Sequence, residues 1–555
     1  MQMILKTAIM MAIIFMVTLS DRAIAIDKND WVRFLEQASF GPTPDLIDTW
    51  QSNDPETWLM SQKLIPASQY SILPSFPASK NIGCPTKDVN YIECRRDNYS
   101  MYPLQVEFFK NAIYSPDQLR LRVAYTLGQI FVVSGMEIDQ PSSMVPYLNI
   151  LVNGALGNFR DLLEKITLNA AMGNYLDMVN NDKPSANGKV QPNENYAREL
   201  LQLFSIGLYQ FNGDGSIQIG PDGSPIPAYN QSVIEGLAHA FTGWTYATVL
   251  SAKPKIHNPE NYLQPMEVYR NKGVDNNHDK NIKHLLTYPH AIFEWLAANQ
   301  TAETDLKQAL DNIFYHPNVG LFIGKQLIQY LVTSNPSLGY VTRVANAFDD
   351  NGNGERGDLF ATVRAVLLDP EARGANVMNT DYGRLREPAL FITNLVRILE
   401  GSSDGILIDK VNDMGQNIFN APSVFGTYPR PFQVKGTSLE GPEFEIESSK
   451  TTLIRDNFVN TLVYSSIVSK APGTGTKISW ARLNPLATNI NPNLLLEYLN
   501  EKLLHGTMPA QMKMIITGAL TCDINAKQTS CKNNKERAQT ALYLVATSAL
   551  YHIQR

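Results

Sequence analysis

The chain has 555 residues and is mildly acidic, because 53 Asp and Glu against 47 Lys and Arg give a formal net charge of −6 at pH 7. This charge is dispersed, which argues against a nucleic-acid-binding protein, since such a protein needs a basic face. The chain is long enough to bury a large core, and length alone would suggest about three or four domains.

The N-terminus is typical of a secretory signal peptide. Lys6 supplies a positive charge, residues 7–20 are almost all apolar, and residues 23–25 read Ala-Ile-Ala, an A-x-A cleavage site. We therefore predict a signal peptide at residues 1–25 and a mature chain that begins at Ile26. The apolar run is short for a membrane anchor. Because no twin-arginine pair is present, we expect export by the general secretory route to the periplasm or the extracellular space, with no transmembrane anchor after cleavage.

Apolar residues recur at helical spacing along most of the mature chain. The predicted helices span Trp31–Gln37, Leu119–Val133, Gly157–Ile166, Asn230–Phe241, Glu303–Phe314, Val319–Leu331, Leu338–Phe348, Asp358–Leu368, Pro388–Leu399 and Arg537–Tyr551. Strand signals are few, and the best is a surface hairpin of Ser216–Gly220 and Pro225–Tyr229. The pattern predicts a mainly α fold, a multi-helix array in one body with long ordered loops and a small β-hairpin. One large helical domain would cover residues 26–555, with a sub-boundary near residues 400–450.

Three long polar stretches interrupt the predicted helices: Ser68–Tyr102, Ser251–Lys283 and Ser423–Lys450. Loops of this length inside a compact chain are usually functional or disordered. The aromatic and proline content of the second and third stretches favours ordered loops that lie over the helical body.

The cysteines form two close pairs, Cys84 with Cys94 and Cys522 with Cys531. Four cysteines allow three pairings. Each close pair flanks a short polar loop, which favours the bridges Cys84–Cys94 and Cys522–Cys531, and export would permit disulfides. Neither pair has the spacing of zinc ligands, so we expect local structural bridges.

The segment NENYARELLQLFSIGL at residues 193–208 is predicted to be a capped helix. Asn193 can accept a hydrogen bond from a free backbone N–H at the start, and Gly207 can end the helix in the left-handed conformation. Glu194 and Arg198 are spaced as an i,i+4 ion pair. One apolar arc holds Ala197, Leu200, Leu201, Phe204 and Leu208, and the opposite stripe holds Asn195, Glu199 and Gln202.

Two interpretations of this helix stay open. In the first, the Glu194–Arg198 pair and the polar stripe are structural, since structural networks imitate active sites. In the second, Glu199 acts as an acid, a base or a ligand. The two glutamates lie roughly 140° apart around the helix, so a second carboxylate for catalysis must come from another segment.

His278, Asp279 and Lys283 form a second candidate group. A histidine beside a carboxylate can ligate a metal or relay a proton. The alternative is that His278 and Asp279 organise a loop through hydrogen bonds to the backbone. His316 precedes Pro317 at the start of a predicted helix, and a capping or packing role explains it better than metal ligation.

Residues 349–354 read DDNGNG and resemble the first half of an EF-hand loop. Asp349, Asn351 and Asn353 occupy the first three ligand positions of such a loop, which makes them candidate metal ligands. The twelfth position is Phe360 and not the usual glutamate. A turn that links two helices is the alternative.

Aromatic residues are dense around the second polar stretch: Trp244, Tyr246, Tyr262, Tyr269 and Trp295. Such a group can line a groove for a sugar or a peptide. It can equally be the underside of a loop that packs on helices, and the sequence does not separate these alternatives.

Several segments together carry a family resemblance. They are RFLEQASFGPT (33–43), AMGNYLDMVNNDK (171–183), NENYARELLQLFSIGL (193–208), FTGW (241–244), HDKNIK (278–283), HPNVGLFIGKQLIQYLVTSNPS (316–337), APSVFG (421–426), GPEF (441–444) and ERAQTALYLVATSALYHIQ (536–554). In this order the chain resembles the bacterial family known as "domain of unknown function 1800", over essentially the whole mature chain.

The resemblance implies an exported, mostly helical protein with no established activity and no accepted catalytic residues. Members are often encoded beside an alkaline-phosphatase-like exported family, which suggests a partner. Where the family commonly has an arginine, this chain has His239, which weakens any metal site formed by Glu235 and His239. Because the resemblance also covers His278 and Lys283, they are our first candidates for partners of Glu199.

Two functions remain in view. In the first, the protein is an acid/base or metal-assisted hydrolase of the cell envelope, with a divalent metal as a candidate cofactor. Glu199 and Asp279 would supply carboxylates, His278 a proton shuttle or ligand, and Arg198 charge stabilisation. Asn195, Lys283 and Trp244 would contribute to binding. In the second, the protein is a non-catalytic binding or assembly partner of another exported protein, and its carboxylates are structural.

Overall fold

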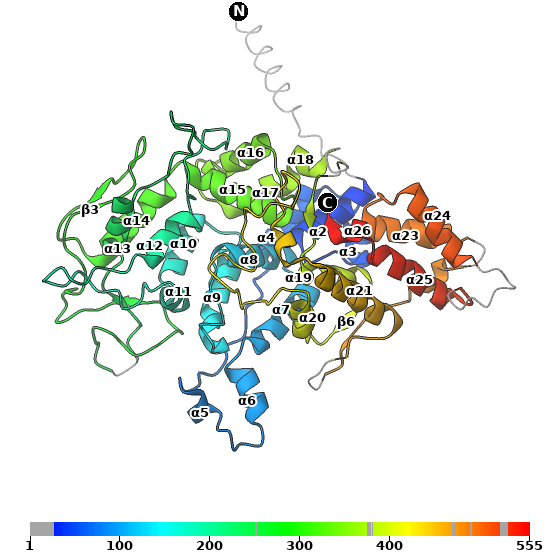
Figure 1. Ribbon diagram of the computed structural model, residues 1–555, viewed down its shortest axis with the longest axis horizontal. Coiled ribbons are helices and arrows are strands. Elements are labelled where there is room, and N and C mark those ends of the chain that lie inside the picture. The colour runs from blue at the N-terminus through cyan, green and yellow to red at the C-terminus, as the bar shows by residue number, and fades with distance from the viewer. Residues whose placement is uncertain are drawn as a thin grey trace, which may run out of the picture.

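Helices account for most of the secondary structure in the computed structural model, which describes residues 27–249, 252–374, 379, 381–468, 473–488, 491–521 and 531–555 (Figure 1). The first half contains α2 (Lys28–Ala38), α3 (Pro44–Trp50), α4 (Pro55–Leu64), α5 (Lys80–Gly83), α6 (Tyr91–Asn98), α7 (Tyr102–Tyr114), α8 (Gln118–Ile130), α9 (Pro141–Gly154), α10 (Phe159–Thr167), α11 (Ala170–Tyr175), α12 (Asn195–Gln202) and α13 (Gln231–Ala240). The second half contains α14 (Ala302–Phe314), α15 (Asn318–Leu331), α16 (Leu338–Asp349), α17 (Leu359–Leu368), α18 (Pro370–Arg373), α19 (Pro388–Ile398), α20 (Ile408–Asp413), the 3₁₀ helix η2 (Pro442–Ile446), α21 (Ser449–Tyr464), α22 (Leu483–Leu486), α23 (Asn493–Leu504), α24 (Ala510–Leu520), α25 (Asn534–Ala546) and α26 (Ala549–His552). The predicted mainly α class is confirmed, and the predicted signal peptide lies outside the described residues.

Short antiparallel strand pairs join segments of the chain, some of them distant in sequence. The pairs are β1 (Trp244–Thr245) with β2 (Glu267–Val268), β3 (Lys283–His284) with β4 (Trp295–Leu296), β5 (Arg384–Leu385) with β8 (Ile553–Gln554), and β6 (Ser402–Ser403) with β7 (Thr476–Lys477). The predicted hairpin at residues 216–229 is present as isolated bridges, such as Ile219 opposite Pro225, and not as continuous strands.

The ten predicted helices in the list above correspond to α2, α8, α10, α13, α14, α15, α16, α17, α19 and α25. The last one was predicted as a single helix to Tyr551, but the helix breaks between α25 and α26. The hydroxyls of Thr547 and Ser548 donate to the carbonyl oxygens of Tyr543 (2.8 Å) and Val545 (2.6 Å). Such side-chain hydrogen bonds compete with the helical ones and explain the break.

The polar stretch Ser68–Tyr102 is not a loop throughout, since it contains α5 and α6, which project from the helical body (Figure 1). Helix α6 buries none of its residues, so it has no apolar face from which periodicity could predict it.

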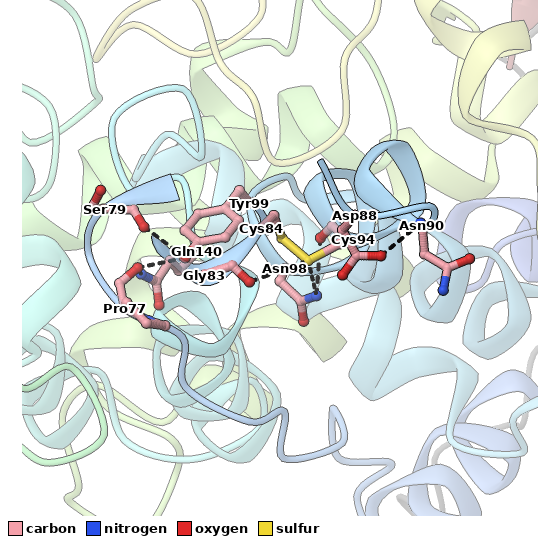
Figure 2. The surroundings of a disulfide bond; sticks show 10 residues. All are labelled: Pro77, Ser79, Gly83, Cys84, Asp88, Asn90, Cys94, Asn98, Tyr99 and Gln140. Atoms are coloured by element: carbon pink, nitrogen blue, oxygen red, sulfur yellow. Dashed lines mark hydrogen bonds between the residues drawn. A yellow bond between two sulfur atoms is a disulfide. The ribbon is translucent and has the colours of Figure 1, made fainter. Parts of the chain in front are cut away.

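The predicted Cys84–Cys94 disulfide is confirmed, with Cα atoms 5.7 Å apart. Figure 2 shows how the unit is tied down: the hydroxyl of Tyr99 and the amide of Gln140 both donate to the carbonyl oxygen of Pro77 (2.6 and 3.3 Å). The predicted Cys522–Cys531 bridge stays a prediction, because Cys522 lies outside the described residues.

Buried apolar side chains form one cluster that extends from Trp31 to Tyr551. Polar contacts tie distant parts of the chain together across this core. Glu36 of α2 accepts a hydrogen bond from Asn394 (2.9 Å) and pairs with Arg386 (3.1 Å) and His505 (3.0 Å). Burial alone would raise the pKa of Glu36, but Arg386 and His505 outweigh it and hold this pKa at about 2.

Candidate functional site

Helix α12 is shorter than the predicted capped helix. Asn193 is not the cap, because its side chain accepts from the N–H of Asn195 (2.8 Å) in a turn before the helix. Asn181 holds this turn by bonding both the N–H (2.8 Å) and the carbonyl oxygen (3.1 Å) of Asn193. Gly207 does adopt the predicted left-handed conformation, with φ +76°.

The predicted apolar arc is buried apart from its last member. Ala197, Leu200, Leu201 and Phe204 are each at most 1% exposed, whereas Leu208 is 47% exposed. The helix ends at Gln202, so helical spacing no longer decides which way Leu208 points.

The predicted Glu194–Arg198 ion pair is present, with Nη2 and Oε2 2.9 Å apart. The two side chains are 33% and 42% exposed. Gln231 of α13 also donates to Glu194 (2.9 Å). The pair is therefore a surface contact between α12 and α13, for which we expect a contribution of about 1 kcal/mol or less.

Glu199 lies in a different environment, although it is on the same helix. The residue is 9% exposed, and its Oε2 atom is buried without a hydrogen-bond partner among the described residues. Burial raises the pKa of Glu199, and the nearby Arg198 offsets this only in part. The carboxyl group is thus biased towards its protonated form.

Two phenols neighbour this carboxyl group. Burial raises the pKa of Tyr175, at the end of α11, to about 12, with further contributions from the charges of Glu137 and Glu199. Burial and the charge of Glu199 likewise raise the pKa of Tyr229 to about 12. In the described part of the chain, the Tyr229 hydroxyl has no hydrogen-bond partner.

Two further carboxyl groups belong to this cluster. Burial and the charge of Asp177 raise the pKa of Glu137. Asp177 has a left-handed backbone, with φ 59°, and its carboxylate accepts from the amide of Asn195 (3.2 Å). Strained backbone at non-glycine residues is concentrated at functional sites. We call Glu137, Tyr175, Asp177, Asn195, Glu199 and Tyr229 the Glu199 cluster.

A cleft of about 770 Å³ shares Glu137 with the Glu199 cluster, and Glu199 itself does not line it. Asn174, the neighbour of Tyr175, lines the cleft with the carboxylates of Asp139 and Glu260. Lys, Arg and His are absent from the described residues that line it. Amides and hydroxyls supply the other polar groups, so the cleft suits an uncharged or cationic ligand better than an anion.

The aromatic residues around the second polar stretch have different roles: some pack under the loop, and one lines the cleft. Trp244 and Tyr246 are buried and pack under the loop. The Tyr246 hydroxyl bonds Asn174 (2.8 Å) and Tyr262 (3.3 Å), which positions Tyr262 in the cleft wall. Trp295 is 58% exposed and stacks on His284. Only Tyr262 of this group therefore contributes to the cleft.

His278 and Lys283 are not partners of Glu199, so that prediction is wrong. The His278 ring is buried between the carbonyl oxygen of Thr242 (2.9 Å) and the Asp305 carboxylate (2.9 Å). The Lys283 ammonium contacts the same carboxylate (2.8 Å). Asp305 belongs to α14, outside the sequence motifs that predicted this group, and its carboxylate contacts both side chains.

Asp279 contacts His239 and accepts from the N–H of Asn281 (3.0 Å). Burial alone would raise the pKa of Asp279, but the His239 contact and the Asn281 bonds hold it at about 2. Both Asp279 and His278 therefore organise the loop after β2, as the structural interpretation expects.

The calcium candidates are arranged as a turn between α16 and α17. Asp349 pairs with Arg356, and the Asn351 side chain bonds the N–H of Asn353 (3.0 Å) and the Asp358 carboxylate (3.0 Å). Across the described residues, no group of three or more His, Cys, Asp or Glu side chains is arranged to hold a metal ion.

The fold and the cluster define a mainly helical protein with a group of carboxyl and phenol side chains, of which Glu137 lines an acidic cleft. Residues 33–553 match the family described as "protein of unknown function (DUF1800)", and the chain belongs to this family. No curated protein and no solved structure matches it. Within the described ranges, no helix is long and apolar enough to cross a bilayer.

Proposed function

We propose that the protein is an acid/base hydrolase in which Glu199 is the proton donor. The observation that carries the proposal is the buried Oε2 atom of Glu199, which meets no hydrogen-bond donor in the described structure. A carboxyl group whose pKa is raised by burial is the usual form of a general acid, and the cluster to which Glu199 belongs meets the cleft at Glu137. Structural carboxylates in this protein contrast with it, since Glu36 and Asp279 are paired and have lowered pKa values.

Glu137 is the second carboxyl group in this proposal. It lines the cleft, and Tyr175 interacts electrostatically with both Glu137 and Glu199. We assign Glu137 the role of the base, which accepts a proton from water as the water attacks the substrate, and Glu199 gives its proton to the leaving oxygen. The reaction consumes one water molecule for each bond that is cleaved. Exchange with solvent then removes the proton from Glu137 and restores the proton on Glu199.

The cleft indicates the class of substrate. Glu137, Asp139 and Glu260 would repel a phosphate or a carboxylate, whereas amides such as Asn174 and the ring of Tyr262 suit hydroxylated groups. We therefore propose an uncharged or cationic polyhydroxylated substrate.

The test compares two substitutions of the same kind on one helix. Glu199→Gln keeps the shape and removes the exchangeable proton, while Glu194→Gln changes only the surface pair. We expect Glu199→Gln to abolish hydrolysis in a panel of glycoside and ester substrates and to fail to complement a deletion strain. Glu194→Gln should retain both. A folded Glu199→Gln protein with full activity and complementation would refute the proposal.

Export is also part of the proposal. The Cys84–Cys94 disulfide supports it, because disulfides persist in oxidising compartments. Sequencing the N-terminus of protein from the cell envelope should give Ile26 as the first residue, and recovery of the chain with Met1 would contradict this.

A second candidate function is binding of another exported protein, for which the alkaline-phosphatase-like family is the first candidate. The projecting α5–α6 unit and the segment before it favour this function, since they expose Ile72, Ile82, Val89 and Ile92 by 71–93%. Co-purification should be lost in Ile82→Glu and Ile92→Glu and kept in Leu453→Glu, which changes an apolar residue exposed elsewhere. Equal recovery of the partner with all three variants would exclude this surface.

A further inference from the structure

A second cavity, of about 80 Å³, lies between α7, α8 and α9 and is covered by residues 416–427. None of the Glu199 cluster lines it. Most of its wall is apolar, with the rings of Phe40, Phe108 and Phe419. Among the described residues that line it, none is Asp, Glu, Lys, Arg or His. At about 10–15 Å³ for one water, the cavity has room for roughly five to eight water-sized atoms.

Two side-chain amides in the cavity wall have a polar atom without a partner. Nδ2 of Asn111 and Nε2 of Gln129 are both buried, and neither bonds to any described residue. The other amide atom of Asn111 bonds the Ser115 hydroxyl (3.2 Å), and that of Gln129 bonds the Tyr428 hydroxyl (3.3 Å). The Tyr428 hydroxyl also donates its single proton to the Glu387 carboxylate (3.0 Å), so towards Gln129 it accepts, and the free atom of Gln129 is then its amide oxygen. The Ser115 hydroxyl can donate or accept, so Asn111 leaves one polar atom unsatisfied in either orientation.

The covering segment is fixed in a strained conformation over the cavity. Phe419 has φ +64°, which is a genuine outlier for a bulky residue. The carbonyl oxygen of Ile418 accepts from Gln105 (2.7 Å), and that of Phe419 accepts from the N–H of Gly135 (2.7 Å). The Ser134 hydroxyl donates to Ala421 (2.7 Å). Strain held by surrounding bonds in this way is typical of ligand clamps.

We propose that this cavity binds a small, uncharged and mainly apolar molecule with one hydroxyl group, such as an alcohol. The apolar wall contributes most of the affinity, and Asn111 and Gln129 bond the hydroxyl group, which can both donate and accept. A charged ligand is excluded, because the wall supplies no opposite charge and burial of an unpaired charge is costly. The site goes beyond the hydrolase proposal and does not depend on it.

The first experiment uses three probes of similar size: cyclohexanol, methylcyclohexane and cyclohexylammonium. Binding to the full chain is measured by ligand-observed NMR and calorimetry. We expect cyclohexanol to bind most tightly, methylcyclohexane more weakly, and cyclohexylammonium not to bind. Equal binding of the ammonium and the alcohol, or no binding of the alcohol, would overturn the proposal.

The second experiment tests the two amides. Gln129→Leu and Asn111→Leu should each weaken cyclohexanol binding by about three- to tenfold and leave methylcyclohexane binding unchanged or tighter. A purely structural effect would weaken both probes equally and would overturn the assignment. Gln326→Leu is the matched control, since Gln326 also has a buried amide without a partner in the described chain but does not line the cavity. It should change neither affinity.

Discussion

Glu199 shows how one residue couples folding to pH. Because burial raises its pKa, the folded state holds the Glu199 proton more tightly than the unfolded state does. The folded state is therefore penalised as the pH rises above the ordinary value of 4.5, and the penalty is absent below that value.

Glu199→Gln removes this penalty, so we expect a higher Tm than that of the wild type at pH 7 and no difference at pH 4. Glu194→Gln should instead lose about 1 kcal/mol or less at pH 7, because it breaks an exposed pair. Thermal unfolding of the three proteins at both pH values measures this. A lower Tm for Glu199→Gln at pH 7 would show that its charge is structural.

Some contacts between single residues could be predicted from the sequence, and others could not. The Glu194–Arg198 pair was predictable because both residues belong to one turn of one helix. The neighbours of Glu199 were not, since Tyr175 and Tyr229 come from other segments and no spacing relates them to α12. Asp305 was missed for the same reason: in the sequence it is an acidic residue in the first turn of a helix, a common surface feature.

Among elements, the packing of α13 on β3 depends on the absence of a side chain at Gly236. A Cβ atom there would lie 1.8 Å from the carbonyl oxygen of His284. We therefore expect Gly236→Ala to lower the free energy of unfolding by about 1–3 kcal/mol.

Gly518→Ala is the matched control on α24, where a Cβ atom would meet nothing within 4 Å. There we expect a gain of about 0.5–1 kcal/mol, because alanine has the higher helix propensity. Urea unfolding distinguishes the two variants. An unchanged free energy of unfolding for Gly236→Ala would contradict the prediction, because it would show that the backbone at the contact between α13 and β3 shifts at little cost.

Helices were predictable where an apolar face gives the 3.6-residue period, as in α14 to α17. Helix α6 was missed because it buries no residue. Helix α9 was missed because it contains Pro146, and a proline in a sequence indicates a break in a helix. Two-residue strands such as β5 and β8 leave no periodicity at all. Their pairing depends on tertiary contacts across the whole chain.

At the scale of the whole molecule, buried neutral histidines determine how it responds to acid. Burial, followed by the charge of Arg356, lowers the pKa of His316 to about 4, and burial with Arg455 and Arg386 does the same for His552. A histidine whose folded pKa is lowered stabilises the fold above the unfolded value of about 6.5, and this stability is lost as the pH falls towards 4.

We expect each of these histidines to contribute about 3 kcal/mol to the loss of stability between pH 6.5 and pH 4. His552→Phe, which keeps a ring beside Phe391, should reduce that loss. The measurement is the free energy of unfolding as a function of pH, and an identical profile for His552→Phe and the wild type would contradict the assignment.

The contacts between distant segments also bear on domain organisation. Arg384 of β5 pairs with Glu443 (2.7 Å) and lies opposite Gln554 of β8, while Gln37 of α2 donates to the carbonyl oxygen of Arg555 (3.2 Å). A chain cut at the predicted sub-boundary near residues 400–450 would lose these partners and leave buried charges unpaired, which typically costs about 3–5 kcal/mol for each broken pair. We therefore expect a fragment of residues 26–420 not to fold and a chain of residues 26–555 to unfold in one calorimetric transition. A protease-resistant fragment, or two separate transitions, would show instead that the sub-boundary separates independent domains.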